Sequence, residues 1–303
     1  MKGAASWGGV LVIAVCAVAG TALASDTDVT DRDRLWANFT REAAVVGAKQ
    51  FWLELQGMVL MDDQSVKQTD NQGATFKGPT LGLNGYPINK PACSSAASAT
   101  TPTCIESIDG GRLDLVGAYG LGANAEVGLD LPFLMQQQIK FVDGSHQSFA
   151  NVGDLLLYGK IKRQLEEHWA AALGLEISIP TGSRSKYLGS GDLGLNPVLS
   201  TRYQGGPLAL GAHVGFLLNT GTQSDVFNWD VDAIVRVTAP FALRCEVNGR
   251  QFRDFGENYT DISIWPGMDF NLTDYFIIRP QGVAHLTNDA LDWGLGIAFV
   301  FTL

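Results

Sequence analysis

Alternation of apolar and polar residues over stretches of about ten residues is the feature that most limits how this chain can fold. In NVGDLLLYGKIKRQLEEHWAAALGLEISIPTG, residues 151–182, apolar side chains recur at every second position, the chain reverses over charged residues, and the alternation resumes. Side chains two residues apart lie on the same face of a β-strand, so the segment predicts a hairpin with one apolar face. That face lies either in the core of a β-sandwich or against lipid.

The same pattern recurs from residue 51 to residue 303, and it predicts an all-β transmembrane antiparallel up-and-down β-barrel of about twelve strands. An even strand number is typical of single-chain outer-membrane barrels, which also have short turns on one rim and longer loops on the other. Here short turns follow every second strand, whereas the other connections include 63–110, 136–151 and 181–192. The predicted strands are 51–61, 113–121, 127–133, 155–162, 173–179, 193–203, 208–220, 226–238, 242–253, 258–270, 275–286 and 291–303.

The end of the chain decides between a sandwich and a membrane barrel. Every second residue from Trp293 to Leu303 is apolar or aromatic, which favours a strand with one face against lipid. The terminal residue is Leu303, whereas many outer-membrane barrels end in Phe. Aromatic residues of the apolar parity also lie near strand ends, as at a membrane interface: Trp169, Phe227, Trp229, Phe270, Phe276, Trp293 and Phe301.

The first residues of the chain predict export. Lys2, an apolar run from Val10 to Val18, and Ala22-Leu23-Ala24 together indicate a signal peptide over 1–24, cleaved near Ala24. After it, no run of 18 apolar residues predicts a membrane helix. The segment 25–50 follows, in which 31–48 has the pattern of a short amphipathic helix, either in the periplasm or in the lumen. The barrel then spans 51–303 and carries the long extracellular loop 63–110.

If the apolar positions of each strand face lipid, the alternate positions line the lumen. These alternate positions are rich in charged residues. A sandwich interior could not hold these charges without a large penalty, because an unpaired buried charge costs about several kcal/mol. A network of salt bridges that fills the lumen and direct contact with a solute are equally compatible with the pattern. The candidate lumen-lining residues are Glu54, Lys160, Lys162, Glu176, Arg202, Asp230, Asp232, Arg236, Arg244, Glu246, Arg250, Asp261, Asp269 and Arg279.

Other classes of function have little support in the sequence. We expect no enzyme, since no G-x-S-x-G motif occurs and His213 and His285 have the lumen parity rather than the lipid-facing parity of an outer-membrane phospholipase. No Cys and His cluster has the spacing of a metal site, so we expect no metal and no cofactor. The net charge of −10 and the lack of a basic stripe argue against nucleic acid.

Four segments resemble, in order, the outer-membrane family named for the meta-pathway of phenol degradation: EVGLDLPF (126–133), NVGDLLLYGKIKRQ (151–164), ALGLEISIPTG (172–182) and LGSGDLGLNPVLS (188–200). The resemblance covers about the C-terminal three-fifths of the chain. It implies a monomeric barrel that passes small hydrophobic or aromatic compounds. It assigns no site residues.

Together these patterns predict a bacterial outer-membrane channel or transporter for the passive uptake of small molecules. The alternatives are a plugged structural or surface-interaction barrel, with loop 63–110 as its working part, and a lipid-modifying enzyme. The expected partners are outer-membrane lipid, a small-molecule solute, and the barrel-assembly machinery, which would recognise the C-terminal strand.

The cysteines generate the first prediction, a disulfide between Cys93 and Cys104. The residues between them are small and bend easily, and an exported loop meets an oxidising compartment. Closing a loop of this length stabilises a protein by about 2–3 kcal/mol in the chain-entropy model. Mass mapping of non-reduced peptides from envelope-derived protein should find the two residues joined, and finding both thiols free would contradict the pairing.

Overall fold

The computed structural model describes residues 48–61, 80–81, 87–88, 105–141, 144–186, 188–221, 225–252, 259–286 and 293–303. The predicted signal peptide, nearly all of the segment 25–50, and both Cys93 and Cys104 lie outside these residues. Among the described residues, no helix is long and apolar enough to cross a membrane.

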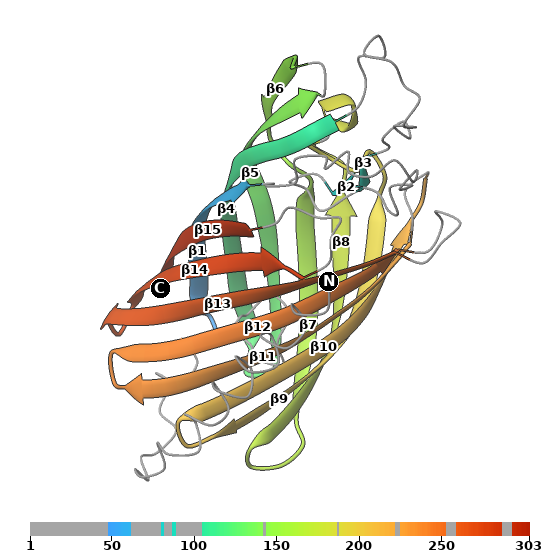
Figure 1. Ribbon diagram of the computed structural model, residues 1–303. Coiled ribbons are helices and arrows are strands. Elements are labelled where there is room, and N and C mark those ends of the chain that lie inside the picture. The colour runs from blue at the N-terminus through green and yellow to red at the C-terminus, as the bar shows by residue number, and fades with distance from the viewer. Residues whose placement is uncertain are drawn as a thin grey trace, which may run out of the picture.

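Twelve antiparallel strands form a closed barrel, which confirms the predicted fold (Figure 1). Each strand pairs with its neighbours in the chain, and the last pairs with the first, so the topology is up-and-down. The strands of the barrel are β1 (Phe51–Met61), β4 (Ile105–Gly122), β5 (Ala125–Phe141), β7 (Leu155–Gln164), β8 (Trp169–Ile179), β9 (Gly194–Gly205), β10 (Leu208–Asn219), β11 (Val226–Thr238), β12 (Phe241–Phe252), β13 (Tyr259–Thr273), β14 (Phe276–His285) and β15 (Trp293–Thr302).

The barrel closes where β15 meets β1. Ten residue pairs join these strands, from Trp52 with Thr302 to Met61 with Trp293. At the end of the seam, the backbone N–H of Phe51 donates to the carbonyl of Leu303 and the N–H of Leu303 donates back, both at 2.8 Å. No strand edge is left open at this position, as a membrane-spanning sheet requires.

The predicted alternation is present in the burial of the strands. In β8, Ala170, Ala172 and Glu176 are buried on the inner face, whereas Leu173 and Leu175 are exposed on the outer face, Leu173 at 65%. The outer face of β15 is likewise apolar and exposed. A face of this kind is stable only against an apolar medium, which is the arrangement of lipid-facing strands.

Aromatic side chains gather at the rim that carries the short turns, here named the turn rim. Four pairs of rings lie within 4.6–5.3 Å of each other there, and each pair joins neighbouring strands. Rings at this depth match the aromatic girdle of membrane barrels. The pairs are Phe51 with Tyr119, Trp169 with Tyr203, Phe241 with Phe270, and Phe276 with Phe301.

The opposite rim, here named the loop rim, differs from the sequence prediction on one side. β4 begins at Ile105, inside the predicted loop 63–110, and β5 continues to Phe141, where it pairs with β6 (His146–Asn151). These strands extend above the rest of the barrel (Figure 1). Their upper parts include polar runs such as 136–138, so they lack the apolar face by which alternation is recognised. The predicted boundaries 63–110 and 136–151 are therefore corrected. The segment 63–110 also holds a two-stranded sheet, β2 (Thr80–Leu81) with β3 (Pro87–Ile88).

The closed hydrogen-bond network generates a prediction about heat stability. Because the barrel has no edge strand from which to fray, it should stay folded in mild detergent at room temperature and unfold only on heating. Unheated and boiled samples should therefore run at different positions on a detergent gel. The protein should also fractionate with outer membranes, and a periplasmic protein without a gel shift would contradict this.

Candidate functional site

The inner face of the barrel holds the predicted lumen-lining residues, all on the parity that faces the interior. Nine are buried to 6% exposure or less, and the other five are half-buried. The buried residues are Glu54, Lys160, Glu176, Arg202, Asp230, Asp232, Asp261, Asp269 and Arg279. The half-buried residues are Lys162, Arg236, Arg244, Glu246 and Arg250.

Arg279 of β14 is the centre of an ionic cluster in the half of the barrel nearer the turn rim. Its Nε donates to Oδ1 of Asp269 at 2.8 Å, and its Nη1 lies 3.3 Å from Oε2 of Glu54. Arg244 approaches the same Asp269 oxygen at 3.8 Å. The cluster joins β1, β12, β13 and β14. Because Arg279, Asp269 and Glu54 are buried, their charges depend on one another for stability.

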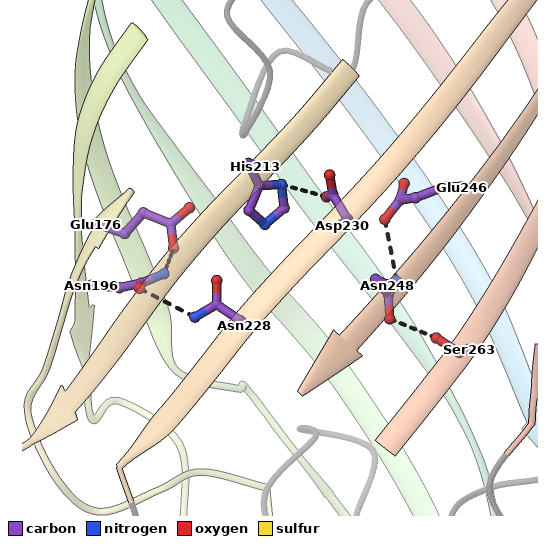
Figure 2. Close-up of polar contacts among 8 residues, drawn as sticks. All are labelled: Glu176, Asn196, His213, Asn228, Asp230, Glu246, Asn248 and Ser263. Atoms are coloured by element: carbon purple, nitrogen blue, oxygen red, sulfur yellow. Dashed lines mark hydrogen bonds and ion pairs between the residues drawn. The ribbon is translucent and has the colours of Figure 1, made fainter. Parts of the chain in front are cut away.

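Further ion pairs lie on other parts of the inner face. Lys160 of β7 lies 3.1 Å from Glu126 of the adjacent strand β5. His213 of β10 contacts Asp230 of β11, as Figure 2 shows. The inner wall is therefore charged in both signs around its circumference.

A chain of hydrogen bonds crosses four strands in the half nearer the loop rim (Figure 2). Asn196 of β9 donates through Nδ2 to Glu176 of β8 at 2.6 Å, and its Oδ1 accepts from Nδ2 of Asn228 at 3.2 Å. Asn228 is on β11, so this second bond passes over the intervening strand β10. A parallel chain runs from Asn248, which donates to Glu246 at 3.2 Å and accepts from Ser263 at 2.7 Å.

Glycines on the inner face of β10 make these crossings possible. A Cβ at Gly215 would lie 2.6 Å from Oδ1 of Asn228 and 2.7 Å from Oδ1 of Asn196. A Cβ at Gly211 would overlap the carboxylate of Asp232. Any other residue at either position would therefore displace the polar side chains that pass over the strand. His213, between the two glycines, is the one large inner side chain among these three positions of β10.

A cavity of about 160 Å³ lies inside the barrel, in the half nearer the loop rim. One part of its lining is polar and the rest is apolar, which suits a small molecule with both kinds of surface. The polar lining includes Arg112, Asp130, Asp154, Glu176, Asn196, Asn228 and Arg250. The apolar lining includes Pro132, Met135, Leu156, Leu217, Val226 and Phe252.

Of the predicted lumen-lining residues, only Glu176 and Arg250 line this cavity. Arg112 was not predicted: it has the inner parity but lies near the end of the supposed loop 63–110, where it bonds Asp114 at 2.6 Å. Two other lining residues were not predicted: Asp154, which belongs to the NVGDL segment, and Asn228, which shares the parity of Asp230. Parity within the correct strand boundaries would have identified Arg112 and Asn228.

The described part of the chain offers no group of three or more His, Cys, Asp or Glu residues that could hold a metal ion. Its histidines on the inner face bond to carboxylates: Nδ1 of His285 lies 2.9 Å from Oδ1 of Asp261, and His213 contacts Asp230. Ser263 bonds with Asn248 and accepts from Trp265, so it belongs to the hydrogen-bond chain of the wall.

Comparisons with known proteins agree with this architecture. A model of the family described as "Putative MetA-pathway of phenol degradation" matches residues 94–302. A crystal structure of an outer membrane channel from Pseudomonas putida F1 is similar with a TM-score of 0.61 at 13% identity, covering 88% of this chain and 99% of the channel. The NanC porin is similar with a TM-score of 0.50 at 8% identity, covering 83% of this chain and 100% of the porin. No curated protein sequence matches the chain.

The Arg279 cluster generates a prediction about stability. Arg279→Met removes the cation and leaves two buried carboxylates facing each other, which should lower the free energy of unfolding by about 3–5 kcal/mol. Denaturant unfolding of the detergent-folded barrel, followed by tryptophan fluorescence, measures this loss. Arg163→Met, at an exposed position of β7, is the matched control and should change stability by less than about 0.5 kcal/mol.

A second variant tests whether the loss comes from unpaired charge. Arg279→Met combined with Asp269→Asn and Glu54→Gln removes the charges together and should recover most of the lost stability. If the triple variant is as unstable as the single one, packing of the arginine side chain is responsible instead.

Proposed function

We propose that this chain, which belongs to the family described for the MetA-pathway of phenol degradation, is an outer-membrane channel through which small molecules diffuse. The observation that carries the proposal is the inner face: a closed barrel surrounds a charged, hydrogen-bonded wall and a cavity of about 160 Å³. An interior that served only to fill the barrel would not need so many charged groups, each of which is costly to desolvate.

The cavity supports a solute with an apolar body and polar substituents. Leu217, Val226 and Phe252 offer an apolar surface to the cavity, and Asn196 and Asn228 offer amide groups. Phenol, which the family description names, has an apolar ring and one hydroxyl group and is of this chemical class. We therefore propose small aromatic compounds as the solutes, taken up passively with size and charge selection by the wall.

Localisation and assembly follow from the same proposal. The barrel would reside in the outer membrane as a monomer, after removal of a leader near Ala24, with its short turns in the periplasm. The barrel-assembly machinery would act on β15, whose outer face is apolar along its length.

A second candidate is a plugged barrel without transport. Two apolar clusters within the lumen favour it. One, nearer the turn rim, includes Trp52, Tyr158 and Ile277. The other, nearer the loop rim, includes Met58 and Leu188. A lipid-modifying enzyme is less well supported, because His213 and His285 bond to acids on the inner face.

Liposome swelling separates the two leading candidates. Proteoliposomes should swell in small neutral sugars, which cross lipid poorly, and more slowly as solute size increases, whereas liposomes without protein should not. A folded, heat-modifiable barrel that admits no solute would favour the plugged barrel.

The charged wall generates a prediction about ion selectivity. Asp230 and Asp232 lie on the inner face of β11 with Arg236 four residues beyond Asp232. Two unit charges at 4 Å interact by about 4 kcal/mol at an effective dielectric of 20, enough to bias which ions pass. Asp230→Asn with Asp232→Asn should therefore lower the cation preference in planar bilayers, and Arg236→Ala should shift it the opposite way.

Reversal potentials across a salt gradient measure these shifts. The shifts should shrink in 1 M salt, where the Debye length is about 3 Å. Asp225→Asn, at the loop rim beyond the lumen charges, is the control and should leave selectivity unchanged. If a conducting barrel shows the same reversal potential in all variants, the charges are enclosed in the wall and do not face the path.

A further inference from the structure

The connection between β8 and β9 folds inward over the mouth at the loop rim. Its residue Leu188 has 0% exposure and belongs to a cluster with Met58 of β1, Met135 of β5 and Val283 of β14. In the closed order of twelve strands, β14 is six strands from β8 by either route. One apolar cluster thus spans the lumen from this loop to the opposite wall.

A single carboxylate holds the two ends of this loop together. Asp154, just before β7, accepts hydrogen bonds from the N–H of Gly182 at 2.9 Å and from the N–H of Ser190 at 2.6 Å. The hydroxyl of Thr181 adds a neighbouring bond, donated to the carbonyl of Gly153 at 2.7 Å. Across the loop, Gln137 of β5 donates to the carbonyl of Lys186 at 2.8 Å.

The loop closes tightly because glycines meet at its base. A Cβ at Gly182 would lie 2.5 Å from the carbonyl oxygen of Leu188, and one at Gly189 would lie 2.6 Å from Oδ1 of Asp154. Gly191 has a φ of +75°, which turns the chain back toward β9. The IPTG and LGSGD segments therefore supply the glycines at the base of the loop, and the VGD segment supplies the carboxylate that binds it. The three segments together form one folded unit.

We propose that residues 181–186 and 188–192 form a gate across the loop-rim mouth, with Leu188 as its stopper and Asp154 as its latch. The proposal rests on the channel function proposed above and explains why a barrel with a charged lumen also contains an apolar plug. Thr181, Arg184 and Ser185 are exposed, so the outer part of the loop faces solvent, while the latch and the Gln137 bond join the loop to β7 and β5. The latch carboxylate also lines the cavity, so a solute that enters the cavity lies beside the group that holds the gate.

Thiol labelling tests the gate without relying on transport. Leu188→Cys in a Cys245→Ser background places one thiol at the stopper, and a charged methanethiosulfonate reagent is added to the folded barrel in outer-membrane vesicles. With the latch intact, labelling should be slow compared with that of the heat-unfolded protein. Adding Asp154→Asn should raise the labelling rate by about tenfold or more, because hydrogen bonds to a charged group are lost.

The matched control is Asp225→Asn in the same labelling background. Asp225 accepts a backbone hydrogen bond from Asn219 at 3.0 Å in the neighbouring β10–β11 connection, so this change removes a similar contact at the same rim. It should leave the labelling rate unchanged. The Cys245→Ser parent without the stopper thiol corrects for any reaction at Cys93 and Cys104.

The outcomes separate the gate from the channel. Fast labelling with the latch intact, or a rate that Asp154→Asn does not change, overturns the gate. If Asp154→Asn speeds labelling and also increases swelling and conductance, both proposals hold. If it speeds labelling but the barrel still admits no solute, the gate stands as a moving loop and the channel function fails.

Discussion

Hydrocarbon offers no hydrogen-bond partner to a peptide backbone, and the rest of this structure depends on that constraint. A membrane-spanning sheet must pair its first strand with its last, as β15 does with β1. Closure in turn divides every strand into an outer face, which must be apolar, and an inner face, which is freed from contact with lipid. The inner face can carry charge only because the apolar outer face makes all the contacts with lipid.

The inner face has its own constraint, because a twelve-stranded barrel leaves little room for water around each charge. The buried charges are therefore stabilised by ion pairing. Arg279 bonds Asp269 and lies near Glu54, and Lys160 pairs with Glu126. Near the loop rim, hydrogen bonds among amide and carboxylate side chains around the cavity take the place of ion pairs. Under the proposed channel function, selectivity and stability therefore depend on the same side chains, so a change that alters one is expected to alter the other.

The alternation in the sequence predicted the number of strands, their order and the inward parity of residues such as Arg279 and Asp230, because parity depends only on backbone geometry. It did not predict the upper parts of β4 and β5, since polar runs there have no apolar face to reveal a strand. Nor could it identify the partners of Arg279, because Glu54 is 225 residues away and the two meet only through closure. The sequence also did not predict the inward fold of the loop that carries Leu188. Asp154, which binds the two ends of that loop, looks like an ordinary turn residue in the sequence, and only its hydrogen bonds reveal its role.

The glycines of β10 have a consequence for how this wall can change over generations. At Gly211 and Gly215 the strand contributes backbone and almost no volume to the lumen, while neighbouring side chains occupy the space above it. Every glycine codon becomes an alanine, valine, arginine or acidic codon by a single base change. The bore and charge of the lumen beside β10 are thus one nucleotide away from several new values, whereas the strand pairing that closes the barrel is unaffected by the identity of these side chains.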